Sequence, residues 1–316
     1  YIVTVVDRAT KFQIKEYYHI FFGAFNTGGF KHFAYILSQI KKETKVVGIS
    51  TGANPMAMKK EFQKRERMFK KRNGVTLKNI ERFSSLNINK IKNKLDHLIY
   101  FGYKKGFVDK SYSNFKKKID LQSCISDKII LKPAEFRIKK QLNNFIYYSG
   151  DGFLHKGLDL LIEFFNKHPK YNLYICSQAH EKKFLEFYNI EKFKNIKFIG
   201  NVVEDSTEAK KIFSKCAFII SLNCSGGSSA SIAVGRRYGL IPIALLNEDL
   251  NTKYSIIIKD EKFETIKNTV EKATKMNLKK YHNLSKKNYL LSHENNSSYF
   301  KKRLKKIIKI ICDEKF

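Results

Sequence analysis

Short apolar segments alternate with amphipathic helical segments from Asn144 to Leu246, and this alternation limits the possible folds more than any other feature. The apolar segments are strand-sized and show no alternation with polar residues, as expected of strands buried on both faces. Repeated strand–helix units of this length predict a doubly wound parallel α/β sheet. The predicted strands are 145–148, 173–176, 196–199, 217–222 and 241–246, and the helices between them are 158–168, 180–188, 208–216 and 230–238.

The first half of the chain is also α/β but less regular. It contains fewer elements than a full domain of this class, so we expect a reduced domain at 1–133 and a second domain at 144–295. Residues 132–142, with Pro133 and a run of charges, are the best linker candidate. The strands predicted in this half are 2–6, 45–50, 98–101 and 128–131, and the longer helices are 30–42, 56–72 and 77–94.

The last segment, 296–316, is predicted to form a basic amphipathic helix. Its apolar side chains recur every three or four residues, which is typical of a helix packed on a protein surface. Contact with a membrane surface is the less favoured alternative. The apolar side is formed by Phe300, Leu304, Ile307, Ile308 and Ile311.

The 61 basic and 29 acidic residues give a formal net charge of +32. Such a field attracts nucleic acid, anionic lipid and phosphorylated ligands. Only nine of the bases are Arg, and the Lys residues are scattered over every helix instead of forming one stripe. A solvated Lys-rich surface is therefore favoured over attraction to an anionic membrane, and specific nucleic-acid binding is favoured least, because no zinc finger, RNP-like sequence or clear helix-turn-helix is present.

The five cysteines are widely spaced and form no CxxC pair, which argues against a disulfide framework and a structural zinc site. A reducing cytosol is the expected location. No apolar run approaches the roughly 18–20 residues that span a bilayer. Residues 1–6 are apolar but lack a preceding basic region, so no signal peptide is recognised; since the first residue is Tyr and not Met, we expect the natural start to lie upstream.

Two turns that join a strand to a helix carry the chemistry. The first is GDGFLHKG at 150–157. Its main-chain amides lie at a helix N-terminus, where the helix dipole favours an anion, and Lys156 adds a positive charge. His155 stands where the GxGxxG fingerprint has its third Gly, and the Walker spacing is absent. The turn is thus either an anion site or a tight turn with an exposed lysine, and His155 is expected to fix the turn.

The second turn is CSGGSSAS at 224–231. Its two Gly residues allow close approach of the backbone to a ligand, and its hydroxyls add hydrogen-bond donors. No carboxylate lies within the stretch, which suits a pyrophosphate; a flexible turn of small residues is the alternative. Because both turns follow strands of one parallel sheet, we expect them to converge on one phosphate-bearing ligand.

The stretch 145–246 resembles the nucleotide-binding domain of glycosyltransferase family 4, a family of the GT-B fold that we take to be represented here by a bacterial member. The matching segments are HKGLDLLIEF at 155–164, NIKFIGNVVED at 195–205 and SLNCSGGSSASIAVGRRYGLIPIAL at 221–245. Residues 50–131 resemble a reduced acceptor domain only faintly. The resemblance implies two Rossmann-like, doubly wound domains, the first reduced, and a C-terminal helix that crosses back onto the first domain.

The resemblance also implies roles for individual residues. Lys156 would neutralise the donor diphosphate as the leaving group departs. The diphosphate and the donor sugar would be bound by Gly152, Ser225, Gly226, Gly227, Ser228 and Ser229. The nucleotide would be bound by Ser177, Asn201, Val203 and Val234. No metal and no cofactor is implied, since the nucleotide sugar is itself the donor substrate.

Several positions depart from the family pattern. The family carries two Glu across the second turn and its helix, where this chain has Gly226 and Val234. Asp151 replaces a basic residue next to the diphosphate. The catalytic His of the first domain has no certain counterpart, so the catalytic residue is unknown; the candidates are His19, His32 and Asn54.

The sequence therefore predicts a metal-independent, retaining hexosyltransferase that moves a sugar from a nucleoside diphosphate sugar to a glycan or lipid-linked glycan acceptor. We expect a role in polysaccharide biosynthesis in the cytoplasm, with peripheral contact to the anionic inner face of the cell membrane. The alternative is a catalytically impaired relic or binding partner of the same fold, favoured by the missing Glu residues.

Overall fold

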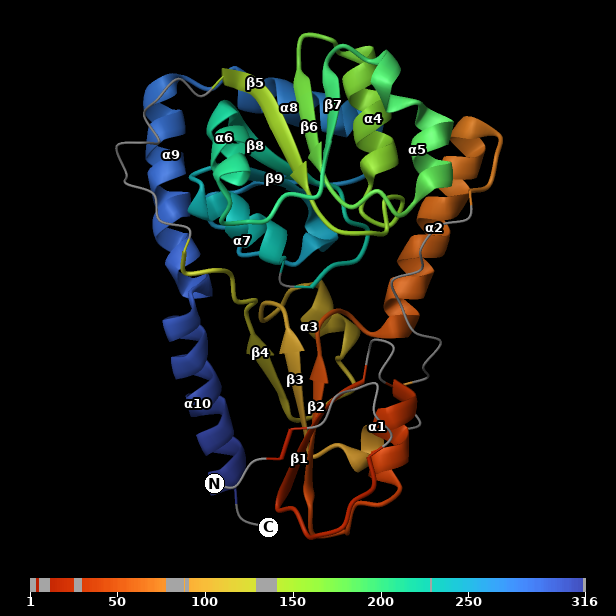
Figure 1. Ribbon diagram of the computed structural model, residues 1–316, viewed down its shortest axis with the longest axis vertical. Coiled ribbons are helices and arrows are strands. Elements are labelled where there is room, and N and C mark those ends of the chain that lie inside the picture. Colours follow the sequence, from red (N-terminus) through yellow and green to blue (C-terminus); the bar gives the residue numbers. More distant parts are fainter. Residues whose placement is uncertain are drawn as a thin grey trace.

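The computed structural model describes residues 4–5, 12–25, 30–77, 88, 91–128, 141–227 and 229–314. They form two parallel sheets stacked along the long axis of the molecule (Figure 1). The strands of each sheet point with their carboxyl ends toward the other sheet. The turns that follow these strands therefore meet in the middle of the molecule.

The first sheet contains four parallel strands in sequential order, β1-β2-β3-β4. Among the described strands of this half the chain always moves on to the neighbouring position in the sheet, and the reversal of direction that defines double winding is seen in the second sheet. Helices α1 (Phe30–Leu37) and α3 (Phe107–Ser111) cover one face through Phe33, Leu37 and Val108. The strands are β1 (Ile20–Ala24), β2 (Lys45–Ser50), β3 (His97–Phe101) and β4 (Lys118–Leu121).

The strand predicted at 2–6 is wrong where the structure describes it. Thr4 and Val5 form no strand and Val5 is 89% exposed; the strand beside β2 is the apolar run Ile20–Ala24 instead. Of the strand predicted at 128–131 only Lys128 is described, and it lies in a turn; the last described strand of this half is β4. The helix predicted at 77–94 falls mostly outside the described residues, and its described part contains only a short 3-10 turn, η2 (Lys92–Lys94). The linker candidate 132–142 also lies almost wholly outside them.

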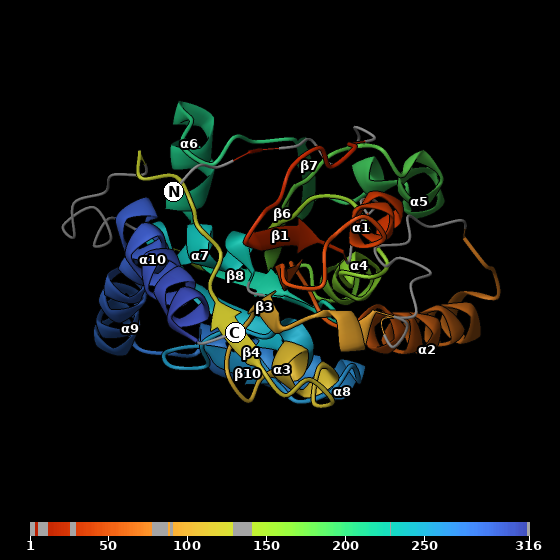
Figure 2. The ribbon, with the colours of Figure 1, turned by 90° about the horizontal axis from the view of Figure 1, so that it is seen from below.

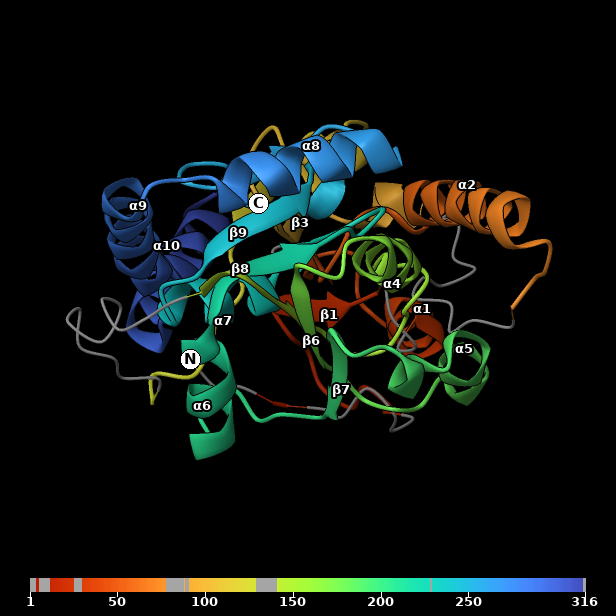
Figure 3. The same cartoon turned by 90° about the horizontal axis from the view of Figure 1, so that it is seen from above.

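The second sheet has the order β10-β9-β8-β5-β6-β7, so the chain reverses direction between β5 and β8. This is the predicted doubly wound topology, and every predicted strand and helix of this half is confirmed to within a few residues. Helices α4 and α8 pack on one face and α6 and α7 on the other (Figure 3). The strands are β5 (Gln141–Tyr148), β6 (Asn172–Cys176), β7 (Ile196–Gly200), β8 (Cys216–Ser221), β9 (Ile241–Leu245) and β10 (Ile256–Ile258). The helices are α4 (Leu158–Lys167), α5 (Lys182–Tyr188), α6 (Thr207–Lys215), α7 (Ala230–Arg237), α8 (Phe263–Thr274) and α9 (Leu278–Leu291).

Helix α2 (Pro55–Asn73) follows β2 in the first half but packs on the second half (Figure 1). Its start is fixed by Asn54, whose side chain accepts from the amide of Met56, and by Pro55 in the first turn. Phe62 and Phe69 are 1% exposed and belong to the apolar core of the second half. The apolar face of α2 therefore joins the two halves.

Arg65 of α2 is fully buried inside the second half. Its guanidinium donates to the carbonyl oxygens of Leu154 at 3.2 Å and Leu222 at 2.7 Å, and to the carboxylate of Glu261 at 2.8 Å. Asp159 lies 3.8 Å away. Burial opposes the charge, but these anions outweigh it and raise the pKa of Arg65.

Helix α10 (Ser297–Asp313) crosses in the opposite direction, from the second half to the first. Ile307 and Ile311 are buried against Val47, Ile99 and Leu121, on the face of the first sheet opposite to α1 and α3 (Figure 2). The predicted crossover helix is thereby confirmed. No helix in the described part of the chain is both long and apolar enough to cross a membrane.

We expect Arg65→Leu to lower the free energy of unfolding by about 3–5 kcal/mol, because it leaves buried acidic partners without their counter-charge. Urea unfolding followed by circular dichroism measures the loss. Arg67→Leu, on the exposed side of the same helix, is the matched control and should change stability by less than about 0.5 kcal/mol. Equal effects of the two variants would show that Arg65 does not join the halves.

Candidate functional site

The two predicted turns meet through His155. Its main-chain oxygen accepts from the amide of Cys224 at 3.0 Å, and its ring Nε2 lies 3.0 Å from the carbonyl oxygen of Ser225. Because a carbonyl only accepts, this ring nitrogen carries the proton. His155 is 1% exposed and stacks on Phe62 of α2. The convergence of the two turns is confirmed, as is the prediction that His155 fixes the first turn.

Lys156 follows His155 at the junction of the turns. Its ammonium donates to the carbonyl oxygen of Gly150 at 3.3 Å, as does the hydroxyl of Ser177. The ammonium also favours the charged form of Glu248. The side chain is half-buried, so its charge is partly withdrawn from water. A positive charge is thus held on the first turn, near enough to Glu248 to favour its charged form.

Glu248 is the functional residue that sequence reasoning missed. It lies in the short η5 (Leu246–Glu248) after β9, is 3% exposed, and accepts from the hydroxyl of Ser221 at 2.7 Å. Burial raises the pKa of Glu248, while Ser221, Ser229 and Lys156 oppose the rise. The turn at 224–231 contains no carboxylate, but the folded site has this one. A signal was present in the sequence, since two adjacent acids follow a predicted strand at the carboxyl edge of the sheet.

Two of the amides that were predicted to bind phosphate, those of Gly152 and Gly226, are already hydrogen-bonded within the protein, as is the neighbouring amide of Phe153. Those of Gly152 and Phe153 both donate to one carboxylate oxygen of Glu181 at 2.7 Å. That of Gly226 donates to the carbonyl oxygen of Asn247 at 3.0 Å. The amide cradle of the first turn therefore does bind an anion, but in this conformation the anion is a side chain of the protein.

Close packing explains the two Gly residues of the second turn. A Cβ at Gly226 would lie 2.5 Å from the carbonyl oxygen of Glu248, and one at Gly227 would lie 2.6 Å from that of Thr51. Thr51 follows β2, so the first half covers the turn. The two Gly residues were predicted to let a ligand approach the backbone closely. In this structure other backbone segments of the protein make that close approach instead.

The other predicted site residues differ in how far their side chains are exposed to solvent. Ser177, Asn201 and Val203 follow the neighbouring strands β6 and β7; Ser177 is buried, and the other two are exposed. Val234 is 1% exposed and packs in the apolar cluster under α6 and α7, so its side chain offers no surface to a nucleotide. Ser228 lies outside the described residues. Ser225 is 1% exposed, and its hydroxyl lies 3.2 Å from the ring of His155.

The catalytic candidates of the first half do not gather at this site. His19 is exposed and precedes β1 at the amino end of the sheet, the end remote from the second half. Asn54 is used as the cap of α2. His32 lies in α1, with its side chain outside the described residues. Asp151 pairs with the exposed His180 at 3.1 Å. Across the described ranges, no cluster of three or more acidic, His or Cys side chains is arranged to hold a metal ion.

Asp249 connects the site to the first half. Its carboxylate accepts from the amides of Tyr103 at 3.2 Å and Val108 at 2.8 Å, at the start of α3. Burial raises the pKa of Asp249 to about 6, although these two donors favour the charged form. The two adjacent acids thus have different contacts. Glu248 interacts with residues at the two turns, and Asp249 binds the first half.

Comparison with solved structures shows which fold surrounds this site. The chain is similar to HepE from Anabaena in complex with UDP and glucose, with a TM-score of 0.64 and 8% identity over 92% of this chain and 78% of HepE. It is similar to sucrose-phosphate synthase from Thermosynechococcus elongatus, with a TM-score of 0.65 and 10% identity over 94% and 75%. The GtfA/B complex gives 0.58 and 10% identity over 91% of this chain.

These likenesses establish the GT-B glycosyltransferase fold. The chain spans 56% of the GtfA/B chain, and thus little more than half the length of some proteins that it matches. No model of a known protein family matches the sequence. No curated protein matches it either.

We expect Glu248→Gln to become more stable relative to the unchanged protein as the pH rises above 4.5, the ordinary value for Glu, because burial raises the pKa of Glu248. The raised pKa means that the folded protein retains a proton that the unfolded chain loses, so ionisation costs the unchanged protein stability in this window. The variant cannot ionise there and still accepts from Ser221. Urea unfolding at a series of pH values measures the difference.

Glu264→Gln, which removes a carboxylate that is 71% exposed, is the control for this series. A constant stability difference between Glu248→Gln and the unchanged protein at every pH would contradict the assignment of Glu248 as a buried carboxylate.

Proposed function

We propose that the protein is a glycosyltransferase that moves a hexosyl group from a nucleoside diphosphate sugar to a glycan or lipid-linked glycan acceptor. The GT-B fold supports the class of enzyme, and HepE was solved with UDP and glucose. The observation that carries the proposal is the position of Lys156, whose ammonium is held on the first turn, next to His155, which joins the two turns at the carboxyl edge of a doubly wound sheet. Open α/β sheets bind their ligands at this edge.

In the proposed reaction, the bond between C1 of the donor sugar and the diphosphate oxygen breaks and the acceptor oxygen forms a new bond to C1 with loss of its proton. Negative charge then develops on the leaving diphosphate. Lys156 would stabilise that charge without needing to move, because its ammonium is held in place before the reaction begins. We expect retention of configuration at C1 and no requirement for a metal ion.

Donor binding requires a rearrangement in this proposal. A diphosphate would have to replace the carboxylate of Glu181 at the amides of Gly152 and Phe153, or bind beside it. It would also compete with Glu248 for the charge of Lys156. Thr51 would have to withdraw from Gly227 before a phosphate reached the second turn. Separation of the two halves at this edge meets all three needs.

A catalytically impaired protein of the same fold is the second candidate. It is supported by the internal hydrogen bonds of the amides of Gly152, Phe153 and Gly226, which a donor would otherwise use. The absence of a carboxylate at position 234 points the same way. Restoring a Glu there is a poor test, since Val234 is buried in an apolar cluster where a charge is costly.

The cellular setting remains part of the proposal. All five cysteines are free, which agrees with a reducing cytosol. The net charge of +32 favours peripheral contact with an anionic membrane face, where a lipid-linked acceptor would be available.

We expect UDP or GDP to bind the full chain, and Lys156→Ala to weaken binding about 10-fold to 150-fold. A hydrogen bond to a charged group contributes about 1.5–3 kcal/mol, which corresponds to that range. Isothermal titration calorimetry measures the affinity. Lys183→Ala, which removes an exposed lysine from α5, is the matched control and should leave the affinity unchanged.

The outcomes separate the candidates. Binding that depends on Lys156, together with release of sugar from a UDP- or GDP-sugar, supports the transferase. Binding without sugar release favours the impaired protein. If neither nucleotide binds, the site is not a nucleotide-sugar site.

A further inference from the structure

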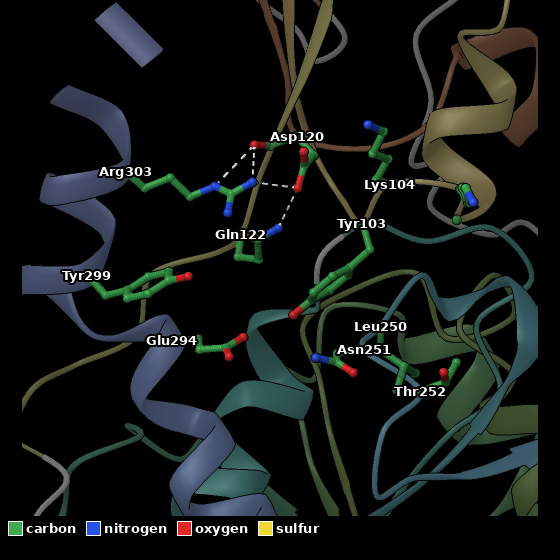
Figure 4. Close-up of a pocket in the computed structure, with 12 residues that line it drawn as sticks. Tyr103, Lys104, Asp120, Gln122, Leu250, Asn251, Thr252, Glu294, Tyr299 and Arg303 are labelled. Carbon is green, nitrogen blue, oxygen red and sulfur yellow. Dashed lines mark hydrogen bonds and ion pairs between the residues drawn. The ribbon is translucent and has the colours of Figure 1, made fainter. Parts of the chain in front are cut away.

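A cavity of about 510 Å³ lies between the two halves, beside α10 and apart from the two turns (Figure 4). This volume falls within the range of small-molecule sites. The wall on the side of the turns includes the backbone of residues 103–106, which Asp249 ties to the second half. The whole cavity is lined by Tyr103, Lys104, Lys105, Gly106, Asp120, Gln122, Leu250, Asn251, Thr252, Glu294, Tyr299 and Arg303.

Several polar groups of this lining have spare hydrogen-bonding capacity within the described part of the chain. The amide of Gln122 donates to Gly102 and Asp120, while no donor is seen at its oxygen. Asn251 accepts from the amide of Lys253, while no acceptor is seen for its nitrogen. The hydroxyl of Tyr299 and the carboxylate of Glu294 add two more such groups. The cavity thus presents donors and acceptors together.

The guanidinium and the two carboxylates of the lining each lie near an opposite charge. The guanidinium of Arg303 donates to the carboxylate of Asp120 at 2.6 Å and to its carbonyl oxygen at 3.0 Å. Glu294 interacts with the positive charge of the buried Arg236. The side chain of Lys104 turns away from the cavity (Figure 4). A phosphate would find no uncommitted guanidinium here, and an apolar ligand would leave the polar groups of the lining without partners.

Two tyrosines supply flat apolar surface in the same space. Tyr103 comes from the first half and Tyr299 from α10, and both side chains point into the cavity together with Glu294 and Asn251 (Figure 4). Tyr299 is 38% exposed, so its ring is accessible. Tyrosine combines an apolar ring with a polar hydroxyl, which suits ligands that are polar at their edges and apolar on their faces.

We propose that this cavity binds a neutral saccharide at a site separate from the donor turns. A sugar carries hydroxyls that both donate and accept, and its C–H faces pack against aromatic rings, so it matches both features of the lining. That the saccharide is a segment of the glycan acceptor rests on the proposed function; its binding does not depend on a nucleotide.

Saturation-transfer difference NMR on the full chain tests the site, with N-acetylglucosamine, lactose and maltose as probes at millimolar concentration and no nucleotide. We expect transfer to at least one of these sugars, reduced at least five-fold in Tyr299→Ala and in Gln122→Ala. Tyr17→Ala is the matched control: this tyrosine is 40% exposed and precedes β1, at the end of the first sheet remote from the cavity. It should leave the transfer unchanged. Circular dichroism melting confirms that each variant is folded.

Absence of transfer to all three sugars would overturn the inference, as would transfer that persists in both cavity variants. Competition by inorganic phosphate would show an anion site instead. Because no nucleotide is present, failure of UDP and GDP to bind would remove the proposed function but leave a positive sugar result standing.

Discussion

The buried guanidinium of Arg65 is the interaction on which both the fold and the candidate site depend. It comes from the first half, yet its hydrogen bonds go to Leu154 in the first turn and Leu222 at the base of the second. Gly157 leaves room for it, since a Cβ there would lie 2.7 Å from the guanidinium and the residue has a φ of +75°. One side chain therefore sets the distance between the two turns, while Phe62 beside it stacks on His155, which links them. The same contacts of α2 thus join the halves and position both turns.

The site is unusual in how a very basic protein uses its few acids. Glu181 and Glu248 are at most 6% exposed and lie where an external anion was expected, while Asp249 joins the halves. Burying a carboxylate is costly unless it is hydrogen-bonded, and each of these accepts from amides, hydroxyls or both. The structure therefore combines an anion-binding framework with carboxyl groups of the protein itself. If a diphosphate can displace Glu181 from the amides and Glu248 from Lys156, the site can bind a donor as an enzyme would; if it cannot, the protein is the impaired counterpart.

The sequence was informative wherever the pattern was local. Fully apolar strands such as Ile241–Leu245 and helices that begin after a Gly-containing turn were placed within a few residues, and the convergence of the turns followed from sheet topology. Failures arose where long-range contacts decide. Lys118–Leu121 is only four residues long and contributes just Ile119 and Leu121 to the contact with α10, so its local signal is short. Ile20–Ala24 competes with an equally apolar terminus. Glu248 was missed because its partners, Ser221 and Lys156, are 27 and 92 positions away in the chain. No local sequence pattern indicates that α2 packs on the second half or that Arg65 is buried there.

The exchange of α2 and α10 between the halves has a consequence for biosynthesis. Helix α2 is made early, but the surface that buries Phe62 and Phe69 is completed only when α4 and α5 have been synthesised. The first sheet, for its part, has one face uncovered until α10 has been made, after every strand and helix of the second half. Until then a nascent chain of this kind exposes apolar surface on both of its halves, and such transiently exposed surface makes a partly folded chain prone to aggregate.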